Sequence, residues 1–502
     1  MLNNSKNFYP VSEIRKLEQL AISTCNLNVA TLMERAGKAA FRELKKRWPH
    51  ARKIVVVCGK GNNAGDGYVV ARLARAAGLS TTILTLASLD KLTGTTREMA
   101  HLCANAKIPM EPFAFEKMKS ADVVVDALLG IGLSGEVHNG YKEVIAAINA
   151  TKIPVLAVDI PSGLNADTGE ILGDAICANL TVTFIAQKQG LFTADALDCC
   201  GTVACDDLDL PENVFQEITA SGKLIDLTGL AQDFPARKHN VNKWDFGHVL
   251  VVGGDYGMSG AARMAAEAAA RVGAGLVSIA TRAEHAALLN LGRPELMSYG
   301  VENLRALDEL LNRATIVVLG PGLGRSTWSK KMWQKVLSSN KPLVIDADGL
   351  NLLANDAKKI TRHTNRVFTP HAKEAARLLG IDANVVQKNR FTTIRLLQEN
   401  YGGVFVLKGA GTIIKGEEEK FNICTAGNAG MASGGMGDIL SGIIAGLFAQ
   451  NLTPFQAAEY GVALHAQAGD AAARDHGTRG LLATDLLPYI SKLINFGPHV
   501  ER

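Results

Sequence analysis

Short apolar runs alternate with helical patterns along most of the chain. Two helical patterns come first, over residues 11–24 and 29–46. The strand-like apolar runs that follow lie at residues 53–58, 81–86, 122–127, 154–159 and 181–185. Short runs that are apolar throughout and are separated by helices are typical of a parallel sheet covered on both faces. The pattern predicts a first α/β domain that ends near residue 225.

A second series of the same kind begins after a polar, irregular stretch over residues 227–247. Its most regular helix is Ala-rich and covers residues 260–275, where glycines end it. Its strand-like runs lie at residues 248–253, 276–281, 315–319, 342–347, 404–408 and 412–415. We predict two tandem α/β domains of different design, residues 1–225 and 226–502, the first one Rossmann-like.

Composition narrows the class of protein. The 502 residues are too many for one ordinary core, and the net charge of +4 gives no support for a nucleic-acid partner. No run approaches the roughly 18–20 apolar residues that span a bilayer, and the N-terminal stretch has no signal pattern. The eight cysteines form no C-x-x-C pair and no zinc pattern, which indicates free thiols in a reducing compartment. We expect a cytoplasmic protein without a membrane partner.

Three loops after strand-like runs of the first domain carry polar side chains. They read GKGNNAGDG (59–67), DALLGIGLSGEV (126–137) and VDIPSGLNADTG (158–169). Ligands of open α/β sheets bind at the carboxyl ends of the strands, so we expect Asn63, Asp126 and Ser162 to meet there. These hard oxygen donors carry a single charge, which favours a weakly hydrated monovalent cation. The alternative is that each aspartate only caps the next helix.

The three motifs closely resemble the YjeF N-terminal domain, the NAD(P)H-hydrate epimerase family. The resemblance implies that Asn63, Asp126 and Ser162 bind K⁺ and that Asp159 contacts the substrate. We interpret Asp159 as the acid–base group at C6 of the nicotinamide hydrate. Because Pro161 cannot continue a strand, we expect Asp159 at the mouth of the sheet, where its removal costs little stability. The residues that the resemblance places around the substrate are Asn62, Asn63, Ala64, Gly65, Asp66, Gly130, Ile131, Gly132, Leu133, Ser134, Gly135, Glu136 and Asp159.

A glycine-rich stretch precedes an apolar helix in the second domain. TAGNAGMASGGMGDILSGIIAG covers residues 425–446 and places Asp438 at the helix start. Backbone N–H groups at a helix N-terminus can hold a developing phosphate anion, while an aspartate there takes a proton from an attacking hydroxyl. The alternative is again a capping aspartate. Further candidates at strand ends and helix starts are Asp346, Asp348, His371, Glu374 and Lys408, the last within reach of phosphate oxygens.

This layout resembles the ribokinase-like superfamily. More narrowly, GHVLVVGGDYGMSGAARMAAEAAARVGAGLVS, LGPGLGR, DADGLNLL, TPHAKEAARLLG and GGMGDILSG resemble the NAD(P)H-hydrate dehydratase family. The resemblance implies that a nucleotide, with Mg²⁺, phosphorylates the C6 hydroxyl of the hydrate, that Asp438 is the base, and that phosphate then leaves. The residues it places at the hydrate are Ala261, Gly322, Leu323, His371 and Asp438. Those it places at the nucleotide are Lys408, Gly409, Ala410, Gly411, Thr412, Gly434, Gly435 and Gly437.

Both halves point to one metabolite. The resemblances imply that the first domain interconverts the R and S forms of NADHX and NADPHX and that the second consumes the S form. ADP and ATP both stay open as phosphoryl donor, although fused family members of the bacterial type favour ADP, and the family implies a homo-oligomer. Two alternatives stay open: a small-molecule kinase of the hydroxymethylpyrimidine or hydroxyethylthiazole type, and a first domain that is a non-catalytic binding module.

Overall fold

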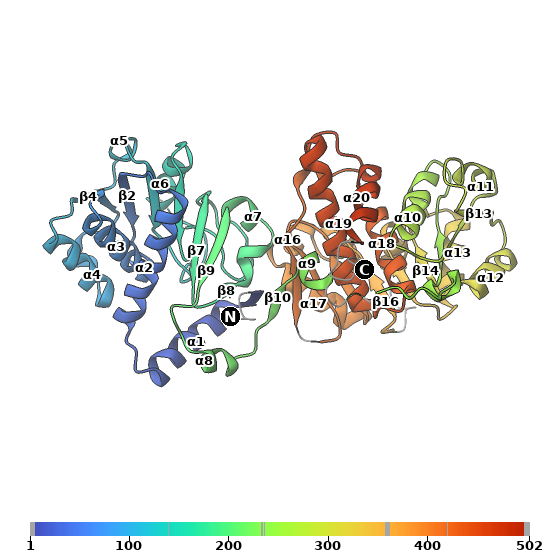
Figure 1. Ribbon diagram of the computed structural model, residues 1–502, viewed down its shortest axis with the longest axis horizontal. Coiled ribbons are helices and arrows are strands. Elements are labelled where there is room, and N and C mark those ends of the chain that lie inside the picture. Colours follow the sequence, from blue (N-terminus) through green and yellow to red (C-terminus); the bar gives the residue numbers. More distant parts are fainter. Residues whose placement is uncertain are drawn as a thin grey trace. The chain divides into compact units, whose positions relative to one another are not determined.

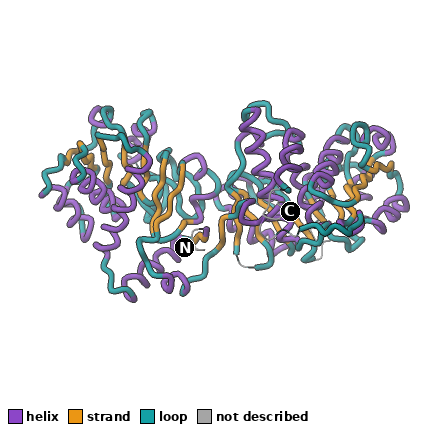
Figure 2. Tube along the Cα trace, in the orientation of Figure 1, coloured by secondary structure: helices purple, strands orange, loops and turns teal. Residues whose placement is uncertain are grey.

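Two sheets, one in each half of the chain, organise this protein, which is described by a computed structural model. The chain divides into two units, Met1–Lys223 and Leu224–Arg502 (Figure 1). The structure describes residues 6–138, 140–231, 234, 236–356, 362–418 and 420–495. Strands and helices alternate within each unit, as the colours of Figure 2 show.

The sheet of the first unit consists of parallel strands. They are β2 (Lys53–Cys58), β3 (Ser80–Thr85), β4 (Met110–Pro112), β5 (Val123–Ala127), β6 (Val155–Val158), β7 (Leu180–Phe184) and β9 (Thr202–Asp206). Their order is β4-β3-β2-β5-β6-β7-β9, and every neighbouring pair is parallel. The strand order reverses direction between β2 and β5. In an open α/β sheet, a ligand crevice forms at such a switch point.

Helices cover both faces of this sheet. They are α1 (Val11–Thr24), α2 (Val29–Arg47), α3 (Asn62–Ala76), α4 (Gly94–Asn105), α5 (Phe115–Met118), α6 (Tyr141–Asn149), α7 (Ala196–Cys199) and α8 (Glu212–Gln216). Successive residues of β2 point to opposite sides: Val56 joins the core formed with α1–α4, and Val57 joins the core formed with α6. Strands buried on both faces explain why the runs are apolar throughout. The short strand β1 (Asn7–Tyr9) is not part of this sheet and pairs with β8 (Gln187–Lys188) and β10 (Gly222–Leu224).

The sheet of the second unit is parallel except at one edge. Its strands are β11 (His248–Val252), β12 (Leu276–Thr281), β13 (Met297–Gly300), β14 (Ile316–Leu319), β15 (Leu343–Ile345), β16 (Arg366–Phe368), β17 (Val404–Leu407), β18 (Thr412–Lys415) and β19 (Phe421–Cys424). They follow the order β13-β12-β11-β14-β15-β16-β17-β18-β19, and the last two pairings are antiparallel. Here the switch point lies between β11 and β14.

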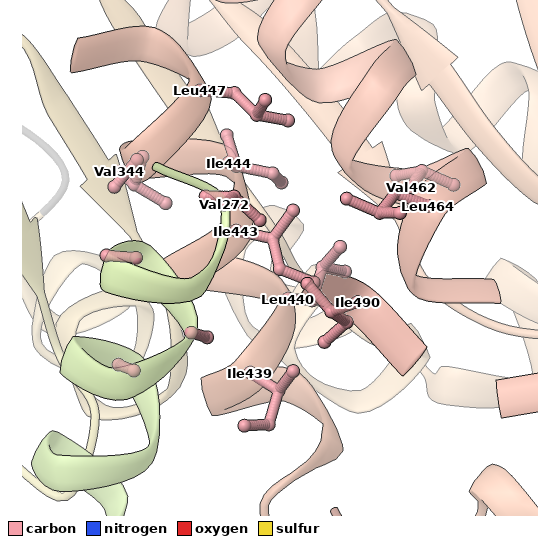
Figure 3. Packing of buried hydrophobic residues seen from close by; sticks show 14 of the residues in the cluster. Val272, Val344, Ile439, Leu440, Ile443, Ile444, Leu447, Val462, Leu464 and Ile490 are labelled. Carbon is pink, nitrogen blue, oxygen red and sulfur yellow. The ribbon is translucent and has the colours of Figure 1, made fainter. Parts of the chain in front are cut away.

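Helices also cover the second sheet. They are α9 (Leu227–Leu230), α10 (Ser259–Arg271), α11 (Ala283–Leu289), α12 (Leu304–Arg313), α13 (Thr327–Leu337), α14 (Ala347–Asn355), α15 (Ala372–Leu379), α16 (Ala383–Lys388), α17 (Arg390–Tyr401), α18 (Met436–Ala449), α19 (Pro454–His476) and α20 (Leu486–Leu493). Figure 3 shows Ile439, Ile443 and Leu447 of α18 in the core that it shares with α10, α19 and α20. A Cβ at Gly442 would lie 2.0 Å from the Ala265 carbonyl oxygen, so α10 and α18 pack with their backbones almost in contact. This packing fixes the N-terminus of α18.

The predicted two-domain α/β fold is confirmed, and several strand ends differ from the prediction by one or two residues. The strand predicted over residues 154–159 ends at Val158, because Asp159 has a left-handed backbone with φ of 66°. The strand predicted over 342–347 ends at Ile345, and Ala347 already belongs to α14. Short strands such as β4, β13, β16 and β19 are absent from the prediction, since three or four residues give too little periodicity. Within the described ranges, no helix has both the length and the apolarity needed to cross a bilayer.

Candidate active sites

A cavity of about 740 Å³ opens at the switch point of the first sheet. The predicted substrate residues that line it are Asn62, Asn63, Asp66, Gly130, Ile131, Gly132, Leu133, Ser134, Glu136 and Asp159. Ala64 and Gly65 instead face inward, where a Cβ at position 65 would lie 2.4 Å from Met33 Sδ. Gly135 turns the second loop, with φ of 80°. The structure thus places most of the predicted substrate residues of loops 59–67 and 126–137 around one cavity.

Asn63, Asp126 and Ser162 meet around the backbone of Leu129, as the sequence predicts. Ser162 Oγ donates to Asp126 Oδ1 (2.6 Å), Leu129 N–H donates to Ser162 Oγ (2.8 Å), and Asn63 Nδ2 donates to the Leu129 carbonyl (3.0 Å). All three side chains are buried, and Asn63 Oδ1 has no hydrogen-bond partner among the described residues. Burial raises the pKa of Asp126 to about 6, although hydrogen bonds from Ser162 lower it. A buried carboxylate beside an orphaned amide oxygen suits a bound cation.

Asp159 is the carboxylate partner of a buried lysine. It accepts hydrogen bonds from Lys188 Nζ (2.5 Å) and from the N–H of Phe184 (3.2 Å). Lys188 also donates to Thr183 Oγ1 and to the Phe184 carbonyl, both at 2.9 Å. The Lys188 side chain is 1% exposed, whereas that of Asp159 is 14% exposed and lines the cavity. This corrects the expectation of a small stability cost, because removing Asp159 deprives a buried ammonium of its counter-charge.

Two further acids share the cavity with Asp159. Burial raises the pKa of Asp66 well above its usual value, and the charges of Asp159 and Glu18 raise it further. Burial and then Asp159 raise the pKa of Glu18, while Lys188 and Arg15 lower it. The cavity therefore combines a carboxylate that is paired with a buried lysine and two acids that hold protons more tightly than free carboxyls do.

Lys188 and Glu18 are functional candidates that sequence reasoning missed. Lys188 lies just beyond the predicted strand over 181–185, at the same sheet edge as Asp159, and that position was the available signal. Glu18 lies in the middle of an amphipathic helix, where a glutamate is ordinary, so the sequence carries no signal for it.

The second site centres on Lys408, directly after β17. Its Nζ lies 2.8 Å from Asp346 Oδ1 and 3.9 Å from Glu374 Oε2. A Cβ added at Gly437 would lie 3.1 Å from the same nitrogen, so the first turn of α18 approaches the ammonium closely. Predicted residues from four separate segments thus meet at the carboxyl ends of the strands.

The charges at this site shift several pKa values. Burial lowers the pKa of Lys408, but Asp346, Glu374 and Asp438 outweigh it and leave the pKa raised. Burial, then Asp346, raises the pKa of Asp438 to about 7, although Lys408 lowers it. Burial likewise raises the pKa of Glu374 to about 7. A carboxyl with a pKa near 7 at a helix N-terminus is well suited to act as a general base.

His371 and the other residues predicted to face the hydrate differ in their solvent exposure. His371 caps α15, since its Nδ1 accepts from the N–H groups of Lys373 and Glu374 at 3.1 and 3.2 Å, and its side chain is half exposed. Burial lowers the pKa of His371. A Cβ at Gly322 would lie 3.0 Å from Ala261 Cβ, so these two predicted residues touch. Leu323 is fully buried, so its side chain has no exposed surface at the site.

Arg390 supports the turn that carries the predicted nucleotide residues after Lys408. Its buried guanidinium donates to the carbonyls of Leu407 (3.0 Å) and Gly411 (3.4 Å), and burial lowers its pKa to about 10. A Cβ at Gly409 would lie 2.8 Å from Arg390 Nη1, so the backbone of the turn packs directly against the guanidinium. Sequence reasoning missed Arg390, because an arginine at the start of a helix is usually exposed.

The glycines before α18 have different surroundings. Gly435 is the residue before the helix and has φ of 90°, and a Cβ there would lie 2.6 Å from Met264 Cε. Only glycine fits this position. Gly434 has no atom within 4 Å of where a Cβ would lie, which leaves its backbone accessible to a ligand.

Two protein-family models match the chain. The model described as YjeF-related protein N-terminus matches residues 29–190, and the one described as NAD(P)H-hydrate dehydratase matches residues 249–492. A relative from Coxiella burnetii, the bifunctional NAD(P)H-hydrate repair enzyme Nnr, is 50% identical over 487 residues, which cover 97% of this chain and 99% of the relative. This chain belongs to the bifunctional NAD(P)H-hydrate repair enzyme family. The family predicted from the motifs is therefore confirmed.

Further relatives of this repair enzyme family agree. The protein of the same name from Escherichia coli is 44% identical over 486 residues, or 96% of this chain and 93% of the relative. A crystal structure of a ribokinase-like superfamily protein from Enterococcus faecalis matches with a TM-score of 0.52 and 28% identity, over 55% of this chain and 97% of that one. Because relatives named as repair enzymes match both halves, the kinase with an accessory domain loses its support. Among the described residues, no group of three or more His, Cys, Asp or Glu is arranged as a metal site.

Proposed function

We propose that this protein repairs hydrated NADH and NADPH in two steps, one in each domain. Residues 1–225 epimerise the R and S forms of NADHX and NADPHX, and residues 226–502 dehydrate the S form with ADP or ATP as phosphoryl donor. The observation that supports this most is that two separate sites, one on each sheet, lie in a chain that aligns end to end with named bifunctional repair enzymes. Neither activity alone would clear both epimers.

Epimerisation at C6 requires the hydroxyl to leave and to return on the opposite face. The ring nitrogen supplies electrons to form a C6=N1 iminium as the hydroxyl departs, so the site must move a proton and tolerate a cation. The Asp159 carboxylate lines the cavity, where its negative charge stabilises that cation. Lys188 holds that carboxylate in place from the buried side.

K⁺ fits the cluster of Asn63, Asp126 and Ser162. Asn63 Oδ1 lacks a hydrogen-bond partner, and Asp126 is a completely buried carboxyl, so both would gain from a cation. When bound, K⁺ would supply positive charge beside the two ligand-binding loops. Asn63 and the Leu129 backbone then keep those loops together.

Dehydration begins with phosphoryl transfer to the C6 hydroxyl. Asp438 takes the proton of that hydroxyl as its oxygen attacks the terminal phosphorus, and the backbone N–H groups around Gly434–Gly437 and the Lys408 ammonium face the negative charge that develops. Loss of phosphate from C6 and of a proton from C5 then forms the C5=C6 double bond and restores the reduced nicotinamide of NADH or NADPH. Mg²⁺ would enter with the nucleotide, and Asp346 and Glu374 are carboxylates of this site that could face it.

The decisive test is turnover of a mixture of both NADHX epimers with ADP and ATP in parallel. We expect the reduced-nicotinamide absorbance to return fully with at least one nucleotide. A truncated chain of residues 1–225 should epimerise without any nucleotide. If the full chain restores no absorbance with either nucleotide, the proposal is wrong.

The potassium site has its own test in the first domain. Epimerisation by the wild type should be faster in potassium chloride than in a bulky ammonium chloride at equal ionic strength. The Asn63→Leu variant should epimerise slowly and at the same rate in both salts. Equal wild-type rates in both salts would contradict the ion site.

The compartment and the assembly are part of the proposal. All eight cysteines are free thiols, which supports a reducing compartment such as the cytoplasm. We also propose a homo-oligomer from the family resemblance, and light scattering of the purified chain would test it.

A further inference from the structure

The cavity of the first site receives side chains from a helix that the family model does not cover. That model matches residues 29–190, whereas α1 spans Val11–Thr24. Ile14, Arg15 and Glu18 of this helix nevertheless line the same cavity as Asp66 and Asp159. The N-terminal helix is therefore a wall of the site.

A hydrogen bond at the first turn of α1 and buried side chains along the helix hold it in place beside the cavity. The N–H of Val11, at the first turn, donates to Asp167 Oδ1 (2.7 Å), in the loop that also carries Asp159. Along the helix, Ile14, Leu17 and Ala21 are buried in the core of the first unit. Glu18 lies one turn after Ile14, so it projects from an anchored surface and not from a mobile end.

The charges in the cavity give Glu18 a different role from Asp159. The Lys188 ammonium donates to Asp159, Thr183 and the Phe184 carbonyl, so Asp159 is the carboxylate that it pairs with. Burial raises the pKa of both Glu18 and Asp66, and the charge of Asp159 raises it further, so both carboxyls hold a proton more readily than free ones do. Asp66 lies on α3 and is one of the residues that the resemblance places at the substrate, whereas Glu18 enters the cavity from α1.

We propose that Glu18 is a catalytic acid–base residue of the epimerase site. This role rests on the proposed function of the first domain. The C6–O bond breaks with its electron pair on oxygen, the Glu18 proton joins that oxygen to form water, and the N1 lone pair forms the C6=N1 bond. Water then adds to the other face of C6 and returns its proton to the Glu18 carboxylate. Asp159, held by Lys188, stabilises the iminium between the two steps.

The test compares Glu18→Gln with Glu13→Gln in the full-length enzyme. Glu13 lies on the same helix but outside the cavity and pairs with Lys16, so its change is a matched control. Epimerisation of the R hydrate is followed with excess ADP, after subtraction of the spontaneous rate. We expect Glu18→Gln to lower kcat by about 10²-fold or more with little change in KM. Glu18→Asp should retain an intermediate kcat, and Glu13→Gln should match the wild type.

Several outcomes would overturn this role. A normal kcat for Glu18→Gln, or a raised KM with kcat unchanged, would make Glu18 only a wall or a binding residue. If Glu18→Gln does not fold, a wild-type kcat for Glu18→Asp or a lowered kcat for Glu13→Gln would have the same meaning. Dehydration of the pure S form by each variant reports on the second domain separately. Failure of the wild type to convert the R hydrate would instead contradict the proposed function itself.

Discussion

Both sites are built on a buried lysine–aspartate pair, but the two pairs are oriented oppositely. In the first site Lys188 is 1% exposed and Asp159 is 14% exposed, so the carboxylate faces the cavity. In the second site Asp346 is 1% exposed and Lys408 is 19% exposed, so the lysine is the more accessible member of the pair. The N–O distances are 2.5 and 2.8 Å. One ion pair thus presents negative charge and the other presents positive charge.

The difference matches the charge of the species that each site stabilises in the proposed mechanism. There, the carboxylate of Asp159 stabilises a cationic iminium intermediate. The ammonium of Lys408, with the N-terminus of α18 beside it, stabilises the anionic phosphoryl group during transfer. In each case the hidden partner fixes the orientation of the exposed one, and a nearby carboxyl has a raised pKa and can move the proton.

The largest effect is expected for Asp438→Asn, which removes the proton acceptor of the second site only. Dehydration of the S hydrate should fall by about 10²–10⁴-fold, while epimerisation stays normal. In the wild type only ionised Asp438 accepts a proton, so the rate should rise with pH through about 7, and the variant should lose this rise. Turnover of pure S hydrate from pH 6 to 8 measures both effects. Near-normal dehydration by the variant would show that another group is the base.

Asp159→Ala should disable the first site and also destabilise its domain. Removing one partner of a buried ion pair costs about 3 kcal/mol, because the Lys188 ammonium loses its counter-charge. For a domain of this size that loss lowers the melting temperature by roughly 6–12 °C. Calorimetry would measure it, and Asp159→Asn, which keeps an acceptor oxygen for Lys188, should lose activity with a smaller shift. An unchanged melting temperature for Asp159→Ala would mean that the pair contributes nothing to the fold.

The smallest effect is expected for Lys408→Met, which removes the positive charge presented by the second site. Loss of a charge-assisted contact to phosphate should raise the KM for ADP or ATP by about 10–100-fold. Epimerisation should not change. Lys373→Met alters the same charge at an exposed position of α15 and serves as the control. Equal nucleotide KM values for the two variants would refute the phosphate-facing role of Lys408, and unfolding curves would show whether unpaired Asp346 destabilises the domain.

The sequence by itself determined the two sheets and the edge of each sheet where chemistry occurs. Apolar runs define parallel strands, and the carboxyl ends of parallel strands lie at one edge, so polar loops after successive strands must converge. That reasoning was sufficient to bring Asn63, Asp126 and Ser162 together and to place Asp438 at the start of α18. It depends on the local hydrophobic pattern and on the strand topology, and both can be inferred from a single sequence.

Only the tertiary structure decided which side chain pairs with which, and which member of each pair faces the ligand. Lys188 is separated from Asp159 by 29 residues, and Lys408 from Asp346 by 62, so no local pattern links them. Glu18 lines the first site, but it lies on an amphipathic helix, where the sequence pattern alone predicts a solvent-exposed glutamate. Burial, which fixes the charge and the proton affinity of each group, arises from the packing of distant segments, and for that reason these residues become visible only in the folded chain.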